Sequence, residues 1–278
     1  MSSYLSQKDS AELTQLIEQF EHFKTLLEEC DYTHSEAEYF EIMSNLWSFR
    51  SAFDNEKVAE AFCHTEFFQE HKSFFLSHEQ YYTRALESAK SISIMTKMAS
   101  STNIGIFDLI NGDYMQQSYN HVNEELKLID TKKCKRLVMV GCGPYPETIL
   151  YLNENIEHTE IIGLDESREA IYMSGKMLES QNLEKIELQS LAGYQFDFTE
   201  VDVVHIANFV PSKKKILDRI VETAPDHVQI LVRTPQLLGS IFYTDPLTNL
   251  NSRLIIVNET ITNQFFSYKT ILLQKFVS

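Results

Sequence analysis

The sequence predicts a helical bundle followed by an α/β domain with a doubly wound parallel sheet and a terminal antiparallel hairpin. Residues 1–104 contain none of the 8 glycines and 6 prolines of the chain, and these are the residues that most often interrupt helices. From residue 135 onward, short β-branched runs alternate with helix-length segments, as is typical of a parallel sheet with crossover helices. Near the C-terminus two strand-like runs follow each other directly, which favours a hairpin.

The first region predicts four helices packed as a bundle. Between Leu13 and Cys30 apolar residues recur at spacings of three and four, which places them on one face of a helix. Similar spacing predicts three further helices over Ala37–Phe53, Val58–Phe75 and Tyr81–Met98. A connector over residues 99–134 then leads to the sheet.

The second region predicts the strands and helices of the sheet. Strand-like runs occupy Arg136–Gly141, Glu160–Asp165, Asp202–Ala207 and Val228–Thr234, and the hairpin runs are SRLIIVNETI and QFFSYKTILLQKF. Helices are expected at Glu147–Asn153, Arg168–Ser180 and Lys213–Thr223, with Lys213–Lys215 as a solvated helix start. We assign residues 1–130 to the helical domain and residues 131–278 to the sheet domain.

Composition and charge exclude several classes of function. Hydrophobic residues make up 43% of the 278 residues and charged residues 23%, as in ordinary globular proteins. The net charge of −16 includes an excess of acidic residues within residues 1–104, so no basic domain is present to bind nucleic acid or an anionic membrane. The N-terminal residues lack a signal-peptide pattern, and no apolar run is long enough to span a bilayer.

The cysteines and histidines predict neither a disulfide framework nor a metal site. Cys30, Cys63, Cys134 and Cys142 show no paired spacing, and the 9 histidines show no ligand spacing. Unpaired cysteines and the absence of an export signal favour a cytoplasmic protein without a bound metal.

The first turn of the sheet domain predicts a nucleoside site. In open α/β sheets, ligands bind at the carboxyl ends of the strands beside this turn, which here reads Gly141-Cys142-Gly143-Pro144-Tyr145-Pro146. Two glycines allow the backbone to approach a ligand closely. Pro146 replaces the third glycine of the dinucleotide fingerprint, which disfavours NAD.

Further residues at the carboxyl ends of the predicted strands favour S-adenosylmethionine as the ligand. Asp165, after Leu164 at the end of the second strand, can accept hydrogen bonds from both ribose hydroxyls. No acid follows the third strand (LQSLAGYQF), so the adenine is expected to meet backbone and apolar groups near Ala192. Asn208, after the fourth strand, is expected to face the same cleft. The glycine turn, the acid and the terminal hairpin predict a class I methyltransferase-like fold.

Four segments resemble one enzyme family. The run LVMVGCGPYPETILYL resembles the glycine loop of nicotianamine synthases and of the related bacterial opine-metallophore synthases of the staphylopine and pseudopaline type, V-G-[SG]-G-[PA]-x-P-x-[TS]. The stretch LVRTPQLLGSIFYTDP resembles the family's Arg-Ser/Thr…Phe/Leu-Tyr…Pro segment, with matches at Arg233, Phe242, Tyr243 and Pro246. The helix RALESAK around Glu87 and the segment Tyr114–Glu125 resemble two parts of the family that precede the loop.

The resemblance implies an aminobutanoyltransferase. Such an enzyme transfers the 3-amino-3-carboxypropyl group of S-adenosylmethionine to the amine of a small amino-acid substrate, plausibly histidine, and releases methylthioadenosine. Glu87 would accept the amine proton, and Tyr114, Arg233, Phe242 and Tyr243 would bind the substrates. The resemblance also implies a homodimer and an opine dehydrogenase as functional partner, which would complete a metal-chelating opine. The helical domain would cover the strand ends as a lid.

Two alternatives remain open at this point. An ordinary S-adenosylmethionine-dependent N- or O-methyltransferase would use the same fold but would release S-adenosylhomocysteine. A non-catalytic S-adenosylmethionine-binding protein would use the acidic helices as a docking surface and would show no turnover.

Overall fold

The computed structural model describes most of the chain, and it divides into two compact units. The described residues are 5–32, 35–100, 113–179, 183, 186–243, 250–263 and 265–276, apart from the side chains of Met98 and residues 113–115. The helical unit comprises Met1–Thr83, Pro235–Tyr243 and Thr262–Tyr268, and the sheet unit comprises Arg84–Thr234, Thr244–Ile261 and Lys269–Ser278. These units are discontinuous in sequence, unlike the expected ranges 1–130 and 131–278, which remain a prediction.

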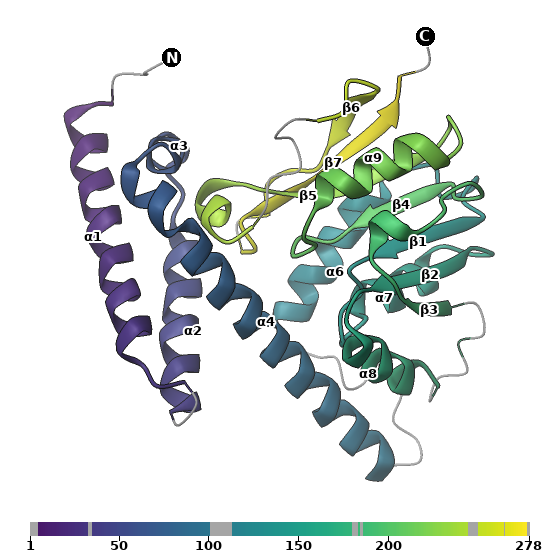
Figure 1. Cartoon of the computed structure of the whole chain (residues 1–278), viewed down its shortest axis with the longest axis horizontal. Helices are drawn as coiled ribbons and strands as arrows, with labels where there is room; N and C mark the ends of the chain where they lie inside the picture. Colours follow the sequence, from purple (N-terminus) through teal and green to yellow (C-terminus); the bar gives the residue numbers. More distant parts are fainter. Residues whose placement is uncertain are drawn as a thin grey trace. The chain divides into compact units, whose positions relative to one another are not determined.

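The helical unit contains helices α1 (Gln7–Glu29), α2 (Glu36–Ala52), α3 (Glu56–Cys63) and the first part of α4 (Glu66–Ser100) (Figure 1). A capping box starts α1, because the Ser6 hydroxyl accepts from the Asp9 N–H at 3.1 Å and the Asp9 carboxylate accepts from the Ser6 N–H at 3.3 Å. Phe20, Phe62 and Phe75 are fully buried, with the ring of Phe20 4.9 Å from that of Phe62 and 5.2 Å from that of Phe75. These rings form the core of the helical unit.

The break between the third and fourth helices differs from the prediction. Helix α3 ends at Cys63 and α4 then runs without interruption to Ser100, whereas the spacing predicted a break between Phe75 and Tyr81. The Thr65 hydroxyl accepts from the Phe68 N–H at 3.2 Å and so caps the start of α4. The apolar pattern lapses near residue 79 because a buried position there holds a charged residue, Glu79, and not because the helix ends.

The sheet unit confirms the predicted doubly wound sheet and its hairpin. Its seven strands have the order β3-β2-β1-β4-β5-β7-β6 (Figure 1). The strands are β1 (Arg136–Val140), β2 (Glu160–Asp165), β3 (Ile186–Ser190), β4 (Val203–Ile206), β5 (Gln229–Pro235), β6 (Leu254–Glu259) and β7 (Tyr268–Lys275). Strands β3, β2, β1, β4 and β5 pair in parallel in that order, and β6 pairs antiparallel with β7. This is the class I methyltransferase-like arrangement that the sequence predicts.

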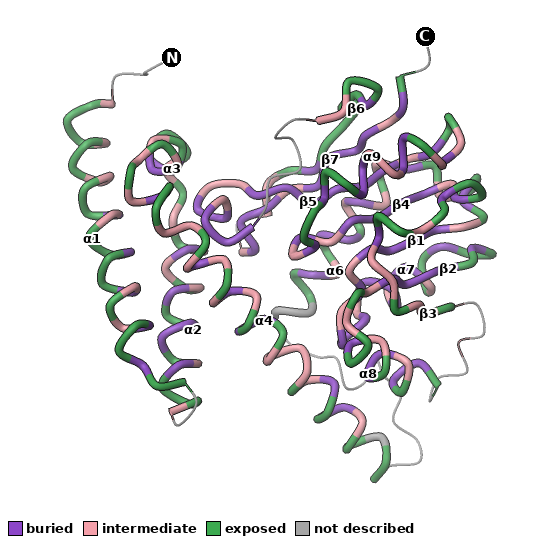
Figure 2. Tube along the Cα trace, in the orientation of Figure 1, coloured by how far each residue is buried: buried purple, intermediate pink, exposed green. Residues whose placement is uncertain are grey.

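Both faces of the central strands β1 and β4 are buried, as expected for parallel strands. Val138 and Val140 of β1 belong to a core with residues of α9 (Lys213–Thr223), whereas Leu137 and Met139 belong to another core with residues of α7 (Glu147–Asn155). The alternation follows from the two-residue period of a strand. Buried residues accordingly line β1 and β4 in Figure 2.

One helix of the sheet unit was not predicted. Helix α6 (Asp113–Leu126) lies within the expected connector, and its Val122 packs in the same core as Leu137. The helix α8 (Arg168–Glu179) and two short 3₁₀ turns, Gly193–Gln195 and Leu237–Ile241, complete the described elements. In the described part of the chain no helix combines the length and apolar character needed to cross a bilayer.

Candidate active site

The glycine loop between β1 and α7 is shaped by two left-handed residues. Gly141 has φ +82° and Gly143 has φ +69°, a conformation that glycine adopts at little cost. A Cβ on Gly141 would lie 2.4 Å from Cγ2 of Val210. The N–H groups of Gly141 and Cys142 both donate to the carbonyl of Leu164, at 2.7 and 3.1 Å. The loop is therefore held against the end of β2 and admits no side chain at Gly141.

Asp165 is anchored by the backbone on both of its oxygens. Its Oδ2 accepts from the N–H of Gly143 at 3.0 Å, and its Oδ1 accepts from the N–H of Ser167 at 2.9 Å. An ionised carboxylate has about four acceptor positions. Each oxygen of Asp165 thus keeps capacity for a further donor such as a ribose hydroxyl, in the place where the sequence predicts one.

Glu87 lies directly against the loop. A Cβ built on Gly143 would come within 2.9 Å of the Glu87 Oε2 atom. One turn further along α4, the Ser91 hydroxyl donates to the carbonyl of Pro144 at 2.7 Å and fixes this part of the helix to the loop. Burial, reinforced by the charges of Glu147 and Asp165, raises the pKa of Glu87 to about 8. Glu87 is thus a carboxyl group that can take up or release a proton near neutral pH.

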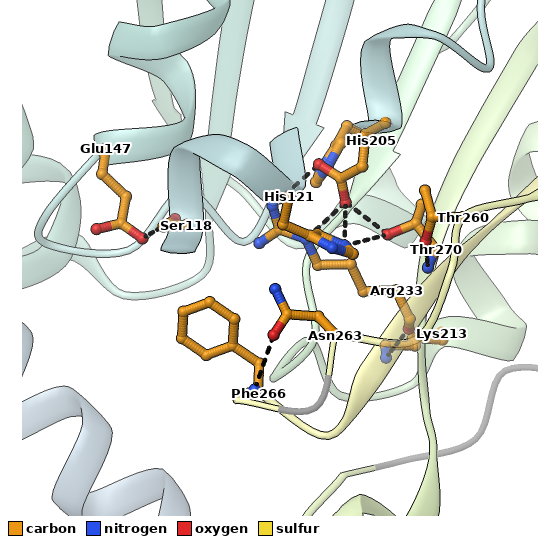
Figure 3. Close-up of polar contacts among 11 residues, drawn as sticks. Ser118, His121, Glu147, His205, Lys213, Arg233, Thr260, Asn263, Phe266 and Thr270 are labelled. Atoms are coloured by element: carbon orange, nitrogen blue, oxygen red, sulfur yellow. Dashed lines mark hydrogen bonds and ion pairs between the residues drawn. The ribbon is translucent and has the colours of Figure 1, made fainter. Parts of the chain in front are cut away.

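A second carboxylate, Glu147, stands at the start of α7 next to the loop. Its Oε1 accepts from the Ser118 hydroxyl of α6 at 2.9 Å, as Figure 3 shows. Its Oε2 is buried and has no hydrogen-bond partner within the described part of the chain. Burial raises the pKa of Glu147, and it lowers the pKa of Lys90, whose charge interacts with both Glu87 and Glu147. The loop is thus flanked by two carboxyl groups with raised pKa values and by one lysine whose pKa is lowered.

Asn208 lies beside the same loop, directly after β4. It is 4% exposed, and neither Oδ1 nor Nδ2 of its amide has a hydrogen-bond partner among the described residues. Its neighbours place it there, because a Cβ on Gly141 would lie 3.3 Å from the Cβ of Ala207 and 2.4 Å from Cγ2 of Val210. A buried amide without partners is costly, so Asn208 offers one donor and one acceptor to a ligand.

The remaining residues of the predicted nucleoside site lie at the carboxyl ends of the strands, beside the same loop. Cys142, Pro144, Tyr145 and Pro146 are buried in the loop, and Leu164 is buried at the end of β2. Burial raises the pKa of the Cys142 thiol, which therefore stays protonated. Ala192 is partly exposed after β3, and the preceding Leu191 N–H donates to the carbonyl of Asp165 at 3.0 Å. Their role in ligand binding remains a prediction.

Arg233 takes part in a buried ionic cluster that the sequence did not predict. Its Nε and Nη2 donate to Oε1 and Oε2 of Glu125 at 2.9 and 3.1 Å. The imidazole of His205 and the hydroxyl of Thr270 also contact the Glu125 carboxylate, at 3.0 and 2.5 Å. His121 lies 3.3 Å from Glu125 as well. Figure 3 shows Arg233, His121, His205 and Thr270 converging on this carboxylate.

The side chains of this cluster lower the pKa of Glu125. Burial alone would raise the pKa of Glu125, but Arg233, His205 and His121 hold it well below its ordinary value. The Nε and Nη2 atoms of Arg233 thus already bind a protein carboxylate, that of Glu125. The charge of Arg233 also acts on Glu147. The predicted binding of a substrate by Arg233 remains a prediction.

Phe242 and Tyr243, predicted to bind substrate, belong to the helical unit. Both are buried, and the ring of Phe242 lies 6.3 Å from the ring of Phe20. The Tyr243 hydroxyl accepts from Nη1 of Arg50 at 2.9 Å. Arg50 is fully buried and pairs with Glu79 at 3.2 Å. In the helical unit these residues form core, and their predicted contact with substrate is untested.

Two other predicted residues fall outside the description. The side chain of Tyr114 in α6 and the whole of Pro246 lie outside the described residues. Sequence reasoning also missed Glu147, Ser118 and Lys90. The signal for Glu147 was its position directly after the loop, where the first residue of a helix faces the ligand edge.

Comparison with known proteins shows what the chain is similar to. No family model matches the sequence, and no curated protein is significantly similar to it. The crystal structure of the nicotianamine synthase MtNAS in complex with MTA and tNA matches with a TM-score of 0.76 at 15% identity, over 99% of this chain and 100% of that chain. A glutamate-to-glutamine variant of MtNAS in complex with S-adenosylmethionine matches with a TM-score of 0.79 at 14% identity, over 94% of this chain and 98% of that chain. The chain therefore has the fold of a nicotianamine synthase over nearly its whole length.

Proposed function

We propose that this protein transfers the 3-amino-3-carboxypropyl group of S-adenosylmethionine to the amine of an amino acid, with histidine as the first candidate, and releases methylthioadenosine. The product would be a nicotianamine-like intermediate of an opine metallophore, which an opine dehydrogenase would complete. The fold shared with MtNAS and the glycine-loop resemblance support this proposal. The same resemblance supports a homodimer, and the four free cysteines support a cytoplasmic location.

The observation that carries the proposal is the position and pKa of Glu87. An amino-acid amine is an ammonium ion near neutral pH and becomes a nucleophile only after it loses a proton. A general base works best when its pKa lies near the working pH. Glu87 meets this requirement beside the loop, because its pKa is raised to about 8. An exposed glutamate, with an ordinary pKa near 4.3, would be a much weaker base.

The residues at the loop fit S-adenosylmethionine as the co-substrate. The two left-handed glycines leave room for a ligand against the backbone, Asp165 keeps acceptor capacity for a ribose, and Asn208 presents an unpartnered buried amide. We assign the ribose to Asp165, the adenine to the vicinity of Ala192, and the polar end of the methionine arm to Asn208.

Atoms and charges balance in the proposed step. Glu87 removes one proton from the acceptor ammonium and later passes it to solvent. S-adenosylmethionine supplies the sulfonium leaving group, so that the carbon–sulfur bond to the methylene of its aminobutyrate arm breaks as the amine nitrogen bonds to that methylene. The chain contributes mainly the positioning of the two partners and the base.

Mass spectrometry of a reaction mixture tests the proposal. Purified protein is incubated with S-adenosylmethionine and a pool of amino acids that includes L- and D-histidine. Release of methylthioadenosine, with one amino acid heavier by an aminobutanoyl group, would support the proposal and identify the acceptor. Release of S-adenosylhomocysteine would contradict it in favour of a methyltransferase. Binding of S-adenosylmethionine without any product would favour the non-catalytic alternative.

A further inference from the structure

Glu147 is a second carboxylate at the glycine loop, and its two oxygens have unequal partners. Oε1 accepts a hydrogen bond from Ser118, which fixes the carboxylate between α6 and α7. Oε2 is equally buried but has no hydrogen-bond partner among the residues that the structure describes. Buried polar atoms are nearly always paired, and an acceptor left unpaired destabilises the folded chain. The arrangement favours a donor supplied by a bound molecule.

The charges around Glu147 favour a cationic donor. The charges of Glu147 and Asp165 both act on Glu87, and those of Lys90 and Arg84 oppose them only in part. Lys90 and Arg233 act on Glu147. Burial raises the pKa of both Glu87 and Glu147 in spite of these cations. Two carboxyl groups in this situation ionise together only when a further positive charge lies close to them. A protonated amine supplies that charge together with hydrogen-bond donors.

We propose that Glu147 binds the ammonium group of the amino-acid acceptor through Oε2 and holds its nitrogen next to Glu87. This inference rests on the proposed function and adds the residue that recognises the acceptor. S-adenosylmethionine also carries an ammonium group on its aminobutyrate arm. The acceptor is favoured because the charge of Glu147 acts on Glu87, and the nitrogen that Glu87 deprotonates belongs to the acceptor.

The inference predicts a selective loss of acceptor affinity in Glu147→Gln. The glutamine keeps the size of the side chain but removes its charge, and a hydrogen bond to a charged group is worth about 1.5–3 kcal/mol. We therefore expect the dissociation constant of the acceptor to rise by about tenfold or more. Affinity for S-adenosylmethionine should change by less than about twofold. Glu154→Gln is the matched control, because Glu154 is exposed on the same helix and should leave both affinities unchanged.

Isothermal titration calorimetry provides the test. Wild type, Glu147→Gln and Glu154→Gln are each titrated with S-adenosylmethionine, and then with the twenty L-amino acids and D-histidine in its presence. Thermal unfolding of each variant verifies that it is folded. A second variant, Ser118→Ala, removes the hydrogen bond to Oε1 but keeps the charge, so it should weaken acceptor binding less than Glu147→Gln does.

Each possible result of these titrations either supports the inference or overturns it. Unchanged acceptor affinity in Glu147→Gln overturns it, and so does a loss confined to S-adenosylmethionine or a wild type that binds none of the amino acids. The products separate this failure from failure of the proposed function. If wild type releases methylthioadenosine while Glu147→Gln binds the acceptor normally, the proposed role of Glu147 is disproved and the proposed function stands. If wild type releases S-adenosylhomocysteine, the proposed function is disproved. The calorimetry then still shows whether Glu147 binds the ammonium group of an amino acid.

Discussion

The sheet unit buries carboxylates in two places, and their ionisation differs. The carboxylate of Glu125 contacts the side chains of Arg233, His205 and Thr270, and its pKa is held well below the ordinary value. Glu87 and Glu147 are half-buried, and their pKa values are raised. The difference lies in the donors, since Glu125 is saturated by protein groups whereas one oxygen of Glu147 has no partner in the described structure. A saturated carboxylate serves stability, and an unsaturated one is available for chemistry.

The largest effect expected from this comparison is the loss of turnover in Glu87→Gln. Glutamine cannot accept the proton of the acceptor amine, and loss of a general base typically costs about 10²–10⁴-fold in rate. The rate of methylthioadenosine release at saturating substrates measures this loss. Glu70→Gln on the same helix α4 is exposed and should retain the wild-type rate. A Glu87→Gln variant with wild-type turnover would remove Glu87 from the mechanism.

The second largest effect concerns stability. Glu125→Ala removes the carboxylate that pairs with the buried Arg233 guanidinium, and breaking a buried ion pair on one side costs about 3–5 kcal/mol. The free energy of unfolding, measured by urea titration, should fall by this amount. The neighbouring Glu124 is partly exposed and pairs with Lys127 on the helix surface, so Glu124→Ala should stay within about 0.5 kcal/mol of wild type. Equal effects of the two substitutions would contradict the structural role of the Glu125 cluster.

Gly143→Ala tests the contact between the loop and Glu87. The residue has φ +69°, and an added Cβ would lie 2.9 Å from Oε2 of Glu87. The left-handed conformation alone costs a non-glycine residue about 1–2 kcal/mol, and displacement of Glu87 should lower turnover further. Gly175→Ala is the control, because Gly175 lies within helix α8 and a Cβ there would meet only Leu188, at 3.9 Å. That variant should be as stable as wild type or slightly more stable.

The comparison also shows what the sequence could predict. The strands β1, β2, β4 and β5 and the helices α7 and α9 were predicted to within about two residues, because their periodicity and turn residues are local signals. The break between α3 and α4 was misplaced because Glu79 sits at a buried position of a continuous helix. Helix α6 was missed because the polar residues His121 and Glu125 occupy its buried positions and obscure the apolar pattern.

The candidate site was predictable only in part. The loop and Asp165 have a fixed local pattern, so sequence spacing identified them. Arg233 pairs with Glu125 of α6, and Glu125 also contacts His205 of β4 and Thr270 of β7. Pairings between residues so far apart in the chain leave no mark in a single sequence. Lys213 illustrates the same limit, because it was expected at a solvated helix start. It is buried instead and donates to the carbonyl of Arg233 at 2.8 Å.

A smaller effect is expected on the pH dependence of stability. The pKa of Glu87 is about 8 in the folded protein, compared with an ordinary glutamate value of 4.5. Its contribution to stability is therefore complete below about pH 4.5 and is lost as pH rises through about 8, since ionisation favours the unfolded chain. Glu87→Gln removes this dependence. Its melting temperature relative to wild type should thus be higher at pH 9 than at pH 5, and a constant difference would contradict the raised pKa.

The most direct test of the account is the pH profile of methylthioadenosine release by wild type, Glu147→Gln and Glu87→Gln. The groups that set the pKa of Glu87 are Glu147 on α7, Asp165 on β2, and Lys90 and Arg84 on α4. Wild-type activity should rise with a midpoint near pH 8. The midpoint should move to lower pH in Glu147→Gln, because a neighbouring negative charge is removed, and Glu87→Gln should show no such rise. A midpoint that is the same in wild type and Glu147→Gln, or a full rise in Glu87→Gln, would contradict Glu87 as the base.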